Sequence, residues 1–596
     1  MNISYPTIVH NFRGPFALCL GILFIFSLPT TGRASAWSQK VRMEDGKKVA
    51  IEVSSMIDVL PPTGYFPLRI HIKNDRDEGG RWLFVFKSTG TYDESTPMSY
   101  SQVFQVGPRE ERRFELMAPI HPSHAGRHIY PRFMIDVSGP EARPDSRVRH
   151  SSSYRSAVGT FAGISTKLAN RNIGALENST STQAVAVIFT RMALESFADD
   201  IRAYSAFDIM LMEHDEWQSL GHQPRYIIKQ WIALGGTLML FAPNPSATAI
   251  PADLENGVGE WPQSWKYGWG RVQLFPMTER QVINAEEVIK SMAALPSLNN
   301  LAQSSYSNVN WPMRRNIPEI RQPRALLLIS SFAVAFIIGP INLFVAHRRK
   351  RHIQLLWTTP ALSMLAGLLI AIFIMFSDGF GGYGQRLVVS HLLSHDQLEV
   401  TVQEQVSRTG VLLSRRFNLP SHTMLNSVQA DNSKGIKPQF KLNIEGVANG
   451  SWFTSRAIQG QVFRKATPSR ARVEIWTNSN NEESEPEIFS AIGDTLKKIY
   501  VVDAEGRHWM AENIHAGESK KLKAIPPAEF RNWWRELRDA GGGLLRMNVG
   551  GSESMVAMFY AEVARPESRL LPSLRSVRWT KDRAFVMGPL MEMAQP

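Results

Sequence analysis

Cysteine is nearly absent from this chain of 596 residues. Cys19 is its one cysteine, and it lies in an amino-terminal stretch typical of a secretory signal. A lipoprotein signal at Cys19 fits less well, because Leu18 stands where a small residue is expected. If the signal is removed, the mature chain has no thiol, which excludes disulfides, a cysteine nucleophile and thiolate metal ligands. Hydrophobic residues make up 43% of the chain, so we expect large domains held together by ordinary cores.

The first 36 residues are predicted to be a secretory signal. His10 and Arg13 precede the apolar stretch Pro15–Pro29, and the small residues Ala34–Ala36 follow it. The apolar part is short for a membrane span, and the small residues fit a cleavage site. The mature protein is therefore expected to begin after Ala36, outside the cytoplasm.

Charge is absent from two long runs, Ala325–Ala346 and Ile353–Phe376. A helix rises about 1.5 Å per residue, so each run is long enough to cross a hydrocarbon core of roughly 30 Å. Two buried helices of a soluble domain would each need a polar face, which neither run has. The runs therefore predict a two-helix transmembrane hairpin, with Gly339-Pro340 and Pro360 as kinks.

The hairpin and the signal together predict a topology. Residues 347–352 form a cytoplasmic loop, and both flanking segments lie outside. The positive residues of this loop agree with the positive-inside tendency: Arg348, Arg349, Lys350 and Arg351. We expect an inner-membrane protein with two spans and most of its mass in the periplasm. Its net charge of +12 suits anionic lipid headgroups or acidic polymers, unless the positive residues are simply spread over solvated faces. Nucleic acid is not an expected partner, since aromatic and basic residues are not interleaved.

Residues 37–168 alternate between apolar and polar residues in the manner of strands. The expected strands are Lys48–Val53, Phe66–Lys73, Trp82–Lys87, Gln102–Val106, Arg112–Met117 and Pro131–Val137. No helical pattern lies between them, so they predict a β-sandwich. Gly64–Ile70, Asn74 and Trp82 resemble the opening strands of immunoglobulin-like adhesion modules. His121, His124 and His128 have spacings that a metal site could use, but Pro122 and Gly126 favour solvated loop histidines.

Residues 172–277 follow a different pattern. The continuous apolar runs Ala184–Phe189, Phe207–Met212 and Thr237–Ala242 are separated by helical stretches, one through Ala203 and one around Arg225–Leu234. Gly268–Phe275 is expected to be a further strand. Runs of this kind indicate a parallel sheet covered by helices on both faces.

Several of these segments together resemble a known family. They are Phe207–Met212, Tyr226–Ile228 with Trp231, Gly235–Leu240 and Gly268–Val272. The pattern is similar to the glutamine-amidotransferase-like (class I, flavodoxin-like) domains of exported bacterial membrane proteins, which are mostly uncharacterised. The resemblance implies a flavodoxin-like fold. Working amidotransferases use a cysteine nucleophile, which the mature chain lacks, and no Gly-x-Ser-x-Gly motif replaces it. We therefore expect a catalytically dead domain, without a cofactor, retained for binding or scaffolding.

The best-placed polar groups of this domain follow its strands. Glu213, His214, Asp215 and Glu216 come directly after one strand, and Asn244 follows the next. Open α/β sheets bind ligands at the carboxyl ends of their strands. The cluster could hold a divalent cation or act as acid and base. Alternatively, it only opens a helix, where acidic residues suit the helix dipole.

Residues 278–324 are predicted to be a connector with one helix, Glu286–Ala294, and residues 377–596 a second β-rich domain. Its expected strands are Arg386–Ser390, Leu398–Glu404, Gln439–Glu445, Gly460–Lys465, Ala471–Trp476, Lys498–Val502, Leu544–Val549 and Met555–Ala561. One helix, Ala528–Ala540, carries an aromatic stripe of Phe530, Trp533 and Trp534. The stripe either packs on its own sheet or lies at the membrane interface.

The sequence thus predicts a multidomain chain: a β-sandwich, a flavodoxin-like α/β domain, a two-helix transmembrane hairpin and a second β-rich domain. The favoured function is a membrane-anchored periplasmic binding or scaffold protein, whose partners are membrane lipid and another envelope protein. The alternative is a metal-dependent hydrolase that acts on an envelope polymer through Glu213–Glu216. A transporter fits less well, because neither apolar run contains an ionisable residue.

Overall fold

The computed structural model describes residues 36–44, 48–89, 98–120, 132–152, 160–183, 185–193, 198–243, 254, 264–295, 313, 317, 324–350, 353, 355–429, 440–442, 446–476, 485–540 and 556–592. Residues 1–35 of the predicted signal lie outside this part of the chain, as do His121, His124 and His128, Asn244, and the predicted strand Leu544–Val549.

The first domain is built from two antiparallel sheets of four strands each. One sheet has the order β1-β2-β3-β6, with the bounds Trp37–Lys40, Val49–Ser55, Tyr65–Asn74 and Glu110–Pro119. The other has the order β5-β4-β7-β8, with the bounds Met98–Val106, Gly80–Thr89, Arg132–Ser138 and Arg147–Ser151. Phe66 of β3 and Phe133 of β7 meet edge to face at 5.4 Å, so the two sheets share one aromatic core. The alternating pattern therefore gave a strand-rich domain, as predicted.

The second domain contains a mostly parallel sheet in the order β10-β9-β11-β12-β14-β13. Its strands are β9 Thr160–Ser165, β10 Val187–Met192, β11 Ile209–Glu213, β12 Thr237–Ala242, β13 Ser264–Tyr267 and β14 Gly270–Pro276. Every neighbouring pair is parallel except β13 with β14. The residues of β9 were predicted to belong to the first domain, but the pairing of β9 with β10 and β11 places it in this sheet. A helix was expected after Phe189 and through Ala203, but the described residues there continue strand β10 to Met192 and then form a short 3-10 turn, η2 Ile201–Tyr204.

Helices cover both faces of this sheet, which explains its continuous apolar strands. Helices α1 (Thr166–Gln183) and α4 (Ala285–Ala294) pack on the face that carries Leu211 and Phe241. Helices α2 (His214–Ser219) and α3 (His222–Ala233) pack on the face that carries Met212 and Leu240. The helix predicted in the connector is therefore α4, and it belongs to the core of this domain.

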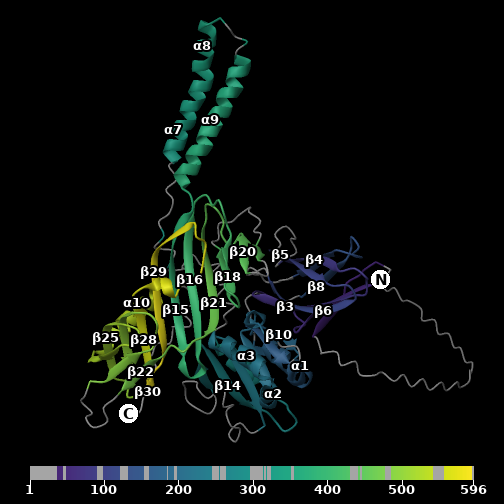
Figure 1. Ribbon diagram of the computed structural model, residues 1–596, viewed down its shortest axis with the longest axis vertical. Coiled ribbons are helices and arrows are strands. Elements are labelled where there is room, and N and C mark those ends of the chain that lie inside the picture. Colours follow the sequence, from purple (N-terminus) through teal and green to yellow (C-terminus); the bar gives the residue numbers. More distant parts are fainter. Residues whose placement is uncertain are drawn as a thin grey trace, which may run out of the picture. The chain divides into compact units, whose positions relative to one another are not determined.

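Two apolar helical stretches follow (Figure 1). The first consists of α7 (Arg324–Phe336), a π-helical turn η4 (Ile337–Ile341) and α8 (Asn342–Arg348), and the second is α9 (Leu355–Asp378). The prolines fall in the π turn and inside α9, and neither breaks its helix. Asn342 joins the stretches, because its amide donates to Thr359 Oγ1 and accepts from Thr358 Oγ1, each at 3.1 Å.

Many of the large apolar side chains described in these helices are exposed. Phe332 is 69% exposed and Trp357 is 80% exposed. In the described part of the chain, one helical stretch, Ser331–Arg348, is long and apolar enough to span a membrane, and the apolar stretch Leu355–Ile370 is shorter. Two membrane spans therefore stay a prediction.

The remaining residues form a second strand-rich domain around a sheet of nine strands, in the order β18-β21-β16-β15-β29-β28-β24-β25-β27. Their bounds are β15 Gly382–Leu393, β16 Leu398–Thr409, β18 Met424–Gln429, β21 Ile458–Pro468, β24 Leu496–Val502, β25 His508–Ile514, β27 Lys523–Ala524, β28 Met558–Val563 and β29 Val577–Pro589. A four-stranded sheet, β26-β23-β22-β30, comprises Ser519–Lys521, Glu487–Ser490, Val473–Trp476 and Met591–Glu592. A three-stranded sheet, β17-β20-β19, comprises Phe417–Asn418, Val447–Gly450 and Phe440–Leu442.

The aromatic helix α10 (Pro527–Ala540) packs on the nine-stranded sheet of its own domain. The ring of Phe530 lies 5.0 Å from that of Tyr560, and Trp533 lies 4.7 Å from Tyr500. Of the two alternatives for this stripe, packing on the sheet is therefore the one observed.

Candidate functional site

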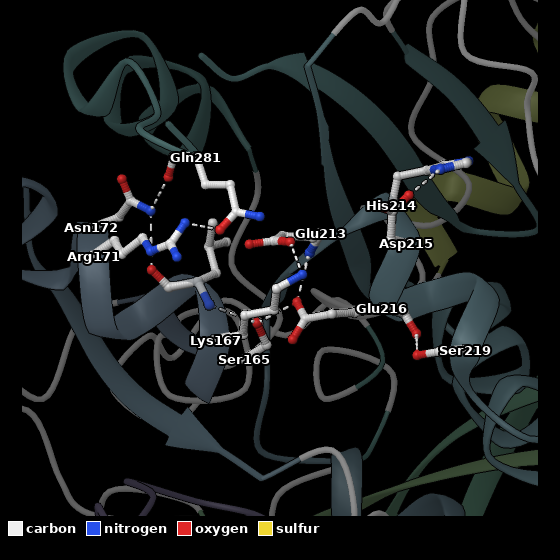
Figure 2. A network of polar contacts seen from close by, with 11 residues as sticks. Ser165, Lys167, Arg171, Asn172, Glu213, His214, Asp215, Glu216, Ser219 and Gln281 are labelled. Atoms are coloured by element: carbon white, nitrogen blue, oxygen red, sulfur yellow. Dashed lines mark hydrogen bonds and ion pairs between the residues drawn. The ribbon is translucent and has the colours of Figure 1, made fainter. Parts of the chain in front are cut away.

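The candidate site lies where the order of the parallel sheet reverses. From β9 the chain passes through α1 to β10 on one side, and it then returns to β11 on the other side of β9. The carboxyl ends of β9 and β11 are Ser165 and Glu213. In doubly wound sheets this switch point is where ligands bind. Figure 2 shows the side chains that meet there.

Ser165 and Glu216 form the centre of the site. The hydroxyl of Ser165 donates to Glu216 Oε2 at 2.7 Å and accepts from the backbone N–H of Leu168 at 3.3 Å, so it caps the start of α1. The same carboxylate oxygen accepts from the backbone N–H of Glu213 at 2.9 Å, as part of a capping box that opens α2. One carboxylate thus joins the first turns of two helices.

Lys167 and Glu213 form a second contact beside it. The Lys167 ammonium, in the first turn of α1, makes an ion pair with Glu213 Oε2. The Glu213 side chain is only 1% exposed, whereas that of Lys167 is 46% exposed. The bond to Glu213 raises the pKa of Lys167, so the lysine stays charged and compensates the buried carboxylate. Burial raises the pKa of Glu216 above its ordinary value. The hydrogen bond from Ser165 opposes this effect without cancelling it.

A third set of hydrogen bonds joins α1 to the segment between β14 and α4. The amide of Asn172 donates to the backbone oxygen of Gln281 at 3.0 Å, and its oxygen accepts from the backbone N–H of Ile283 at 3.1 Å. Arg171 donates to the side chain of Gln281 (Figure 2). These bonds hold the segment between β14 and α4 against α1.

The predicted tetrad is divided in the structure. Glu213 and Glu216 point to the centre, whereas His214 and Asp215 lie apart from them (Figure 2). His214 Nδ1 is 3.7 Å from Asp215 Oδ1, and the Asp215 side chain is 80% exposed. No group of three or more His, Cys, Asp or Glu side chains among the described residues is arranged to hold a metal ion. Asn244 lies outside these residues.

The arrangement mainly fixes the two helix starts. Glu213 and Glu216 are buried, and their partners are Lys167, Ser165 and a backbone N–H. Ser165 and Lys167 were not among the predicted site residues, because strand β9 was not predicted. The available signal was the serine immediately before a helix, which is a preferred N-cap residue.

Comparisons with known proteins give no family. No protein-family model matches the chain, and no curated protein matches it. Solved structures match weakly. A Paenibacillus sp. cycloisomaltooligosaccharide glucanotransferase matches at 10% identity and a TM-score of 0.17, over 34% of this chain and 27% of that chain. The yeast delta-COP-I mu-homology domain matches at 8% identity and a TM-score of 0.16, over 36% of this chain and 97% of that chain. The Amycolatopsis orientalis exo-chitosanase CsxA matches at 10% identity and a TM-score of 0.17, over 87% of this chain and 78% of that chain. These scores carry no argument about function.

Proposed function

We propose that this chain is an inner-membrane-anchored periplasmic binding or scaffold protein that does not turn over a substrate. Its α/β domain would be a flavodoxin-like, amidotransferase-like domain without catalytic activity. The two apolar stretches would form the transmembrane hairpin. The immunoglobulin-like first domain and the second strand-rich domain would present surfaces to another envelope protein.

The main support for this proposal comes from the polar side chains at the carboxyl ends of β9 and β11, which are bonded to one another. An enzyme of this architecture needs a reactive group there that can reach a substrate. Here the Ser165 hydroxyl is bonded to Glu216 and the Lys167 ammonium is paired with Glu213, so each of these two groups is held by a buried carboxylate. The amidotransferase nucleophile would be a cysteine, and Cys19 is the one cysteine of the chain.

The outward-facing apolar helices support the membrane anchor. Phe336, Phe344 and Met364 are between 61% and 81% exposed. Soluble proteins rarely expose so many large apolar side chains on neighbouring helices, because the hydration of apolar surface is unfavourable. A bilayer would cover it, and Asn342 would bond to the threonines of α9 within the hairpin.

Reporter fusions test the anchor and its orientation. A periplasm-dependent phosphatase fused after Pro596 should be active, and the same reporter inserted at Lys350 should be inactive. A reporter at Pro596 that works only in the cytosol would overturn the proposed placement.

Turnover assays test the absence of catalysis. The purified full-length chain, incubated with envelope polymers and divalent cations, should release no product. Activity that disappears in Asp215→Ala or His214→Ala would instead establish the metal-dependent hydrolase. Glu177→Ala, an exposed position on α1, is the matched control.

A further inference from the structure

One end of the nine-stranded sheet adjoins the apolar helix α9. Strands β15 and β29 begin at this end, and β16 ends there. Tyr383, near the start of β15, is paired with Arg408 near the end of β16 and with Arg578 near the start of β29. The link from α9 is short. Val411 N donates to the Gly379 carbonyl at 2.9 Å, and Gly379 directly follows the last residue of α9.

The loops at this end are joined to one another by backbone hydrogen bonds. Gly381 N donates to Val411 O at 3.0 Å, and Gly410 N donates to Gly381 O at 2.8 Å. Arg456 N donates to Gly410 O at 3.0 Å. The loop before β21 and the loop after β16 are therefore held at the base of α9.

This surface combines exposed apolar side chains with exposed arginines. Leu413 is 84% exposed and Phe380 is 50% exposed. Both lie at an ordered part of the backbone, because Phe380 forms a β-bridge with Val411, two residues before Leu413. We call the following residues the collar: Phe380, Leu413, Arg416, Arg456, Arg575 and Arg578. All four arginines of the collar are exposed.

Three of the four collar arginines lack a carboxylate partner in the described part of the chain. Arg416, Arg575 and Arg578 make no ion pair with any residue in the described ranges. Two half-buried aromatic rings belong to the same strand ends, and the guanidinium groups of Arg408 and Arg386 lie 5.5 Å and 5.0 Å from their centres. The rings belong to Tyr383 and Trp579. Tyrosine, tryptophan and arginine beside an apolar span are the residues that contact lipid headgroups.

We propose that the collar docks on the headgroup layer of an anionic phospholipid bilayer. This inference rests on the membrane anchor proposed above and adds a specific contact to it. The arginines would bind headgroup phosphates, and Leu413 and Phe380 would enter the acyl boundary. The domain would then be held against the bilayer by its surface as well as by α9.

A fluorescent label at position 413 tests the contact in the full-length chain. Leu413→Cys is made in a Cys19→Ser background and labelled with nitrobenzoxadiazole. The chain is reconstituted in nanodiscs of phosphatidylcholine alone, or of equimolar phosphatidylcholine and phosphatidylglycerol. Emission should shift to the blue and be quenched by spin-labelled lipid, more strongly in the anionic discs. The same label at Val282, an exposed apolar position in the parallel-sheet domain, should show neither change.

Matched charge variants test the role of the arginines. Arg575→Gln with Arg578→Gln should remove most of the difference between the two kinds of disc. Arg531→Gln with Arg535→Gln, on the exposed face of α10, should preserve it. Equal emission from labels at 413 and 282, or equal effects of the two double variants, would overturn the collar.

Flotation of the same samples separates the two proposals. A chain that does not float with lipid vesicles would overturn both the anchor and the collar. A chain that floats but keeps a water-exposed label at 413 would overturn the collar alone.

Discussion

Single side chains join the first domain, the α/β domain and the second strand-rich domain. His422 Nδ1 lies 3.5 Å from Asp200 Oδ2, although the two residues belong to different domains. Asp200 also accepts from Arg202, whose guanidinium lies 5.9 Å from the centre of the Tyr65 ring in β3. The Tyr65 hydroxyl accepts from the backbone N–H of Leu425 at 3.5 Å. One small polar network thus connects three domains.

The network should depend on pH. The bond to Asp200 raises the pKa of His422 above its ordinary value of 6.5. Its stabilising contribution is therefore complete below about pH 6.5 and is lost as the pH rises through the raised value. Burial would raise the pKa of Asp200, but the bonds from His422 and Arg202 hold it well below its ordinary 3.8. The contribution of Asp200 is therefore lost only in strong acid.

We expect the melting temperature of the full-length chain to fall between about pH 6 and pH 8. His422→Gln should lower the melting temperature at pH 6 and flatten this dependence, whereas the exposed His515→Gln should change neither. Differential scanning calorimetry of the three proteins measures both effects. An unchanged slope in His422→Gln would show that the pair does not stabilise the junction.

Lys167→Met should destabilise the parallel-sheet domain. It leaves the carboxylate of Glu213, which is 1% exposed, without its cation. A buried group without its partner costs about 1–3 kcal/mol. Thermal unfolding should begin at a lower temperature, and Lys167→Met combined with Glu213→Gln should recover part of the loss. No recovery in the double variant would argue against the ion pair as the cause.

At the scale of elements, helix α10 shows how a sequence pattern acquires its meaning from its surroundings. An apolar face bounded by arginines can lie on a membrane or on a sheet. Here the face meets aromatic residues of β24, β28 and β29, and Phe530 is 1% exposed. The arginines of the helix remain on its outer side.

Phe530→Ala should therefore destabilise the second strand-rich domain by about 3–5 kcal/mol, because it leaves a cavity between α10 and the sheet. Arg531→Ala on the exposed face should change the stability by no more than about 0.5 kcal/mol. Hydrogen exchange of the backbone amides of β24 and β28 would report the difference. Equal exchange in both variants would contradict the packing.

At the scale of the whole molecule, a buried ion pair joins the α/β domain to the second strand-rich domain. Lys229 Nζ of α3 lies 2.5 Å from Asp396 Oδ1, in the 3-10 turn between β15 and β16. The Tyr267 hydroxyl donates to the other oxygen of Asp396 at 2.8 Å. The side chains of Lys229 and Asp396 are 11% and 15% exposed.

Asp396→Ala should weaken the contact between these domains by about 3–5 kcal/mol, since it leaves the Lys229 charge buried and uncompensated. Limited proteolysis should cut the chain faster in the loops around α3 and the β15–β16 turn. The double variant Lys229→Met with Asp396→Leu should be cut more slowly than Asp396→Ala alone. A single variant as resistant as the original chain would exclude this role.

The sequence by itself determined the type and position of those strands and helices whose apolar residues repeat at a clear period. The alternating strands of the first domain, the continuous strands β11 and β12, helix α4 and the aromatic helix α10 all appear close to their predicted bounds. Their apolar residues repeat at the period of the element that buries them, so a local window contains the information.

The tertiary structure decided what pairs with what. Strand β29 was not predicted, because the charged residues Lys581, Asp582 and Arg583 interrupt its apolar pattern, yet it pairs in parallel with β15 in the middle of the nine-stranded sheet. Asp582 is stabilised there by Arg386, at 2.5 Å across the strands. Likewise, the Ser165–Glu216 bond joins residues 51 positions apart. The order of the strands in each sheet brings such distant residues together. The pattern of residues within one segment does not contain that order.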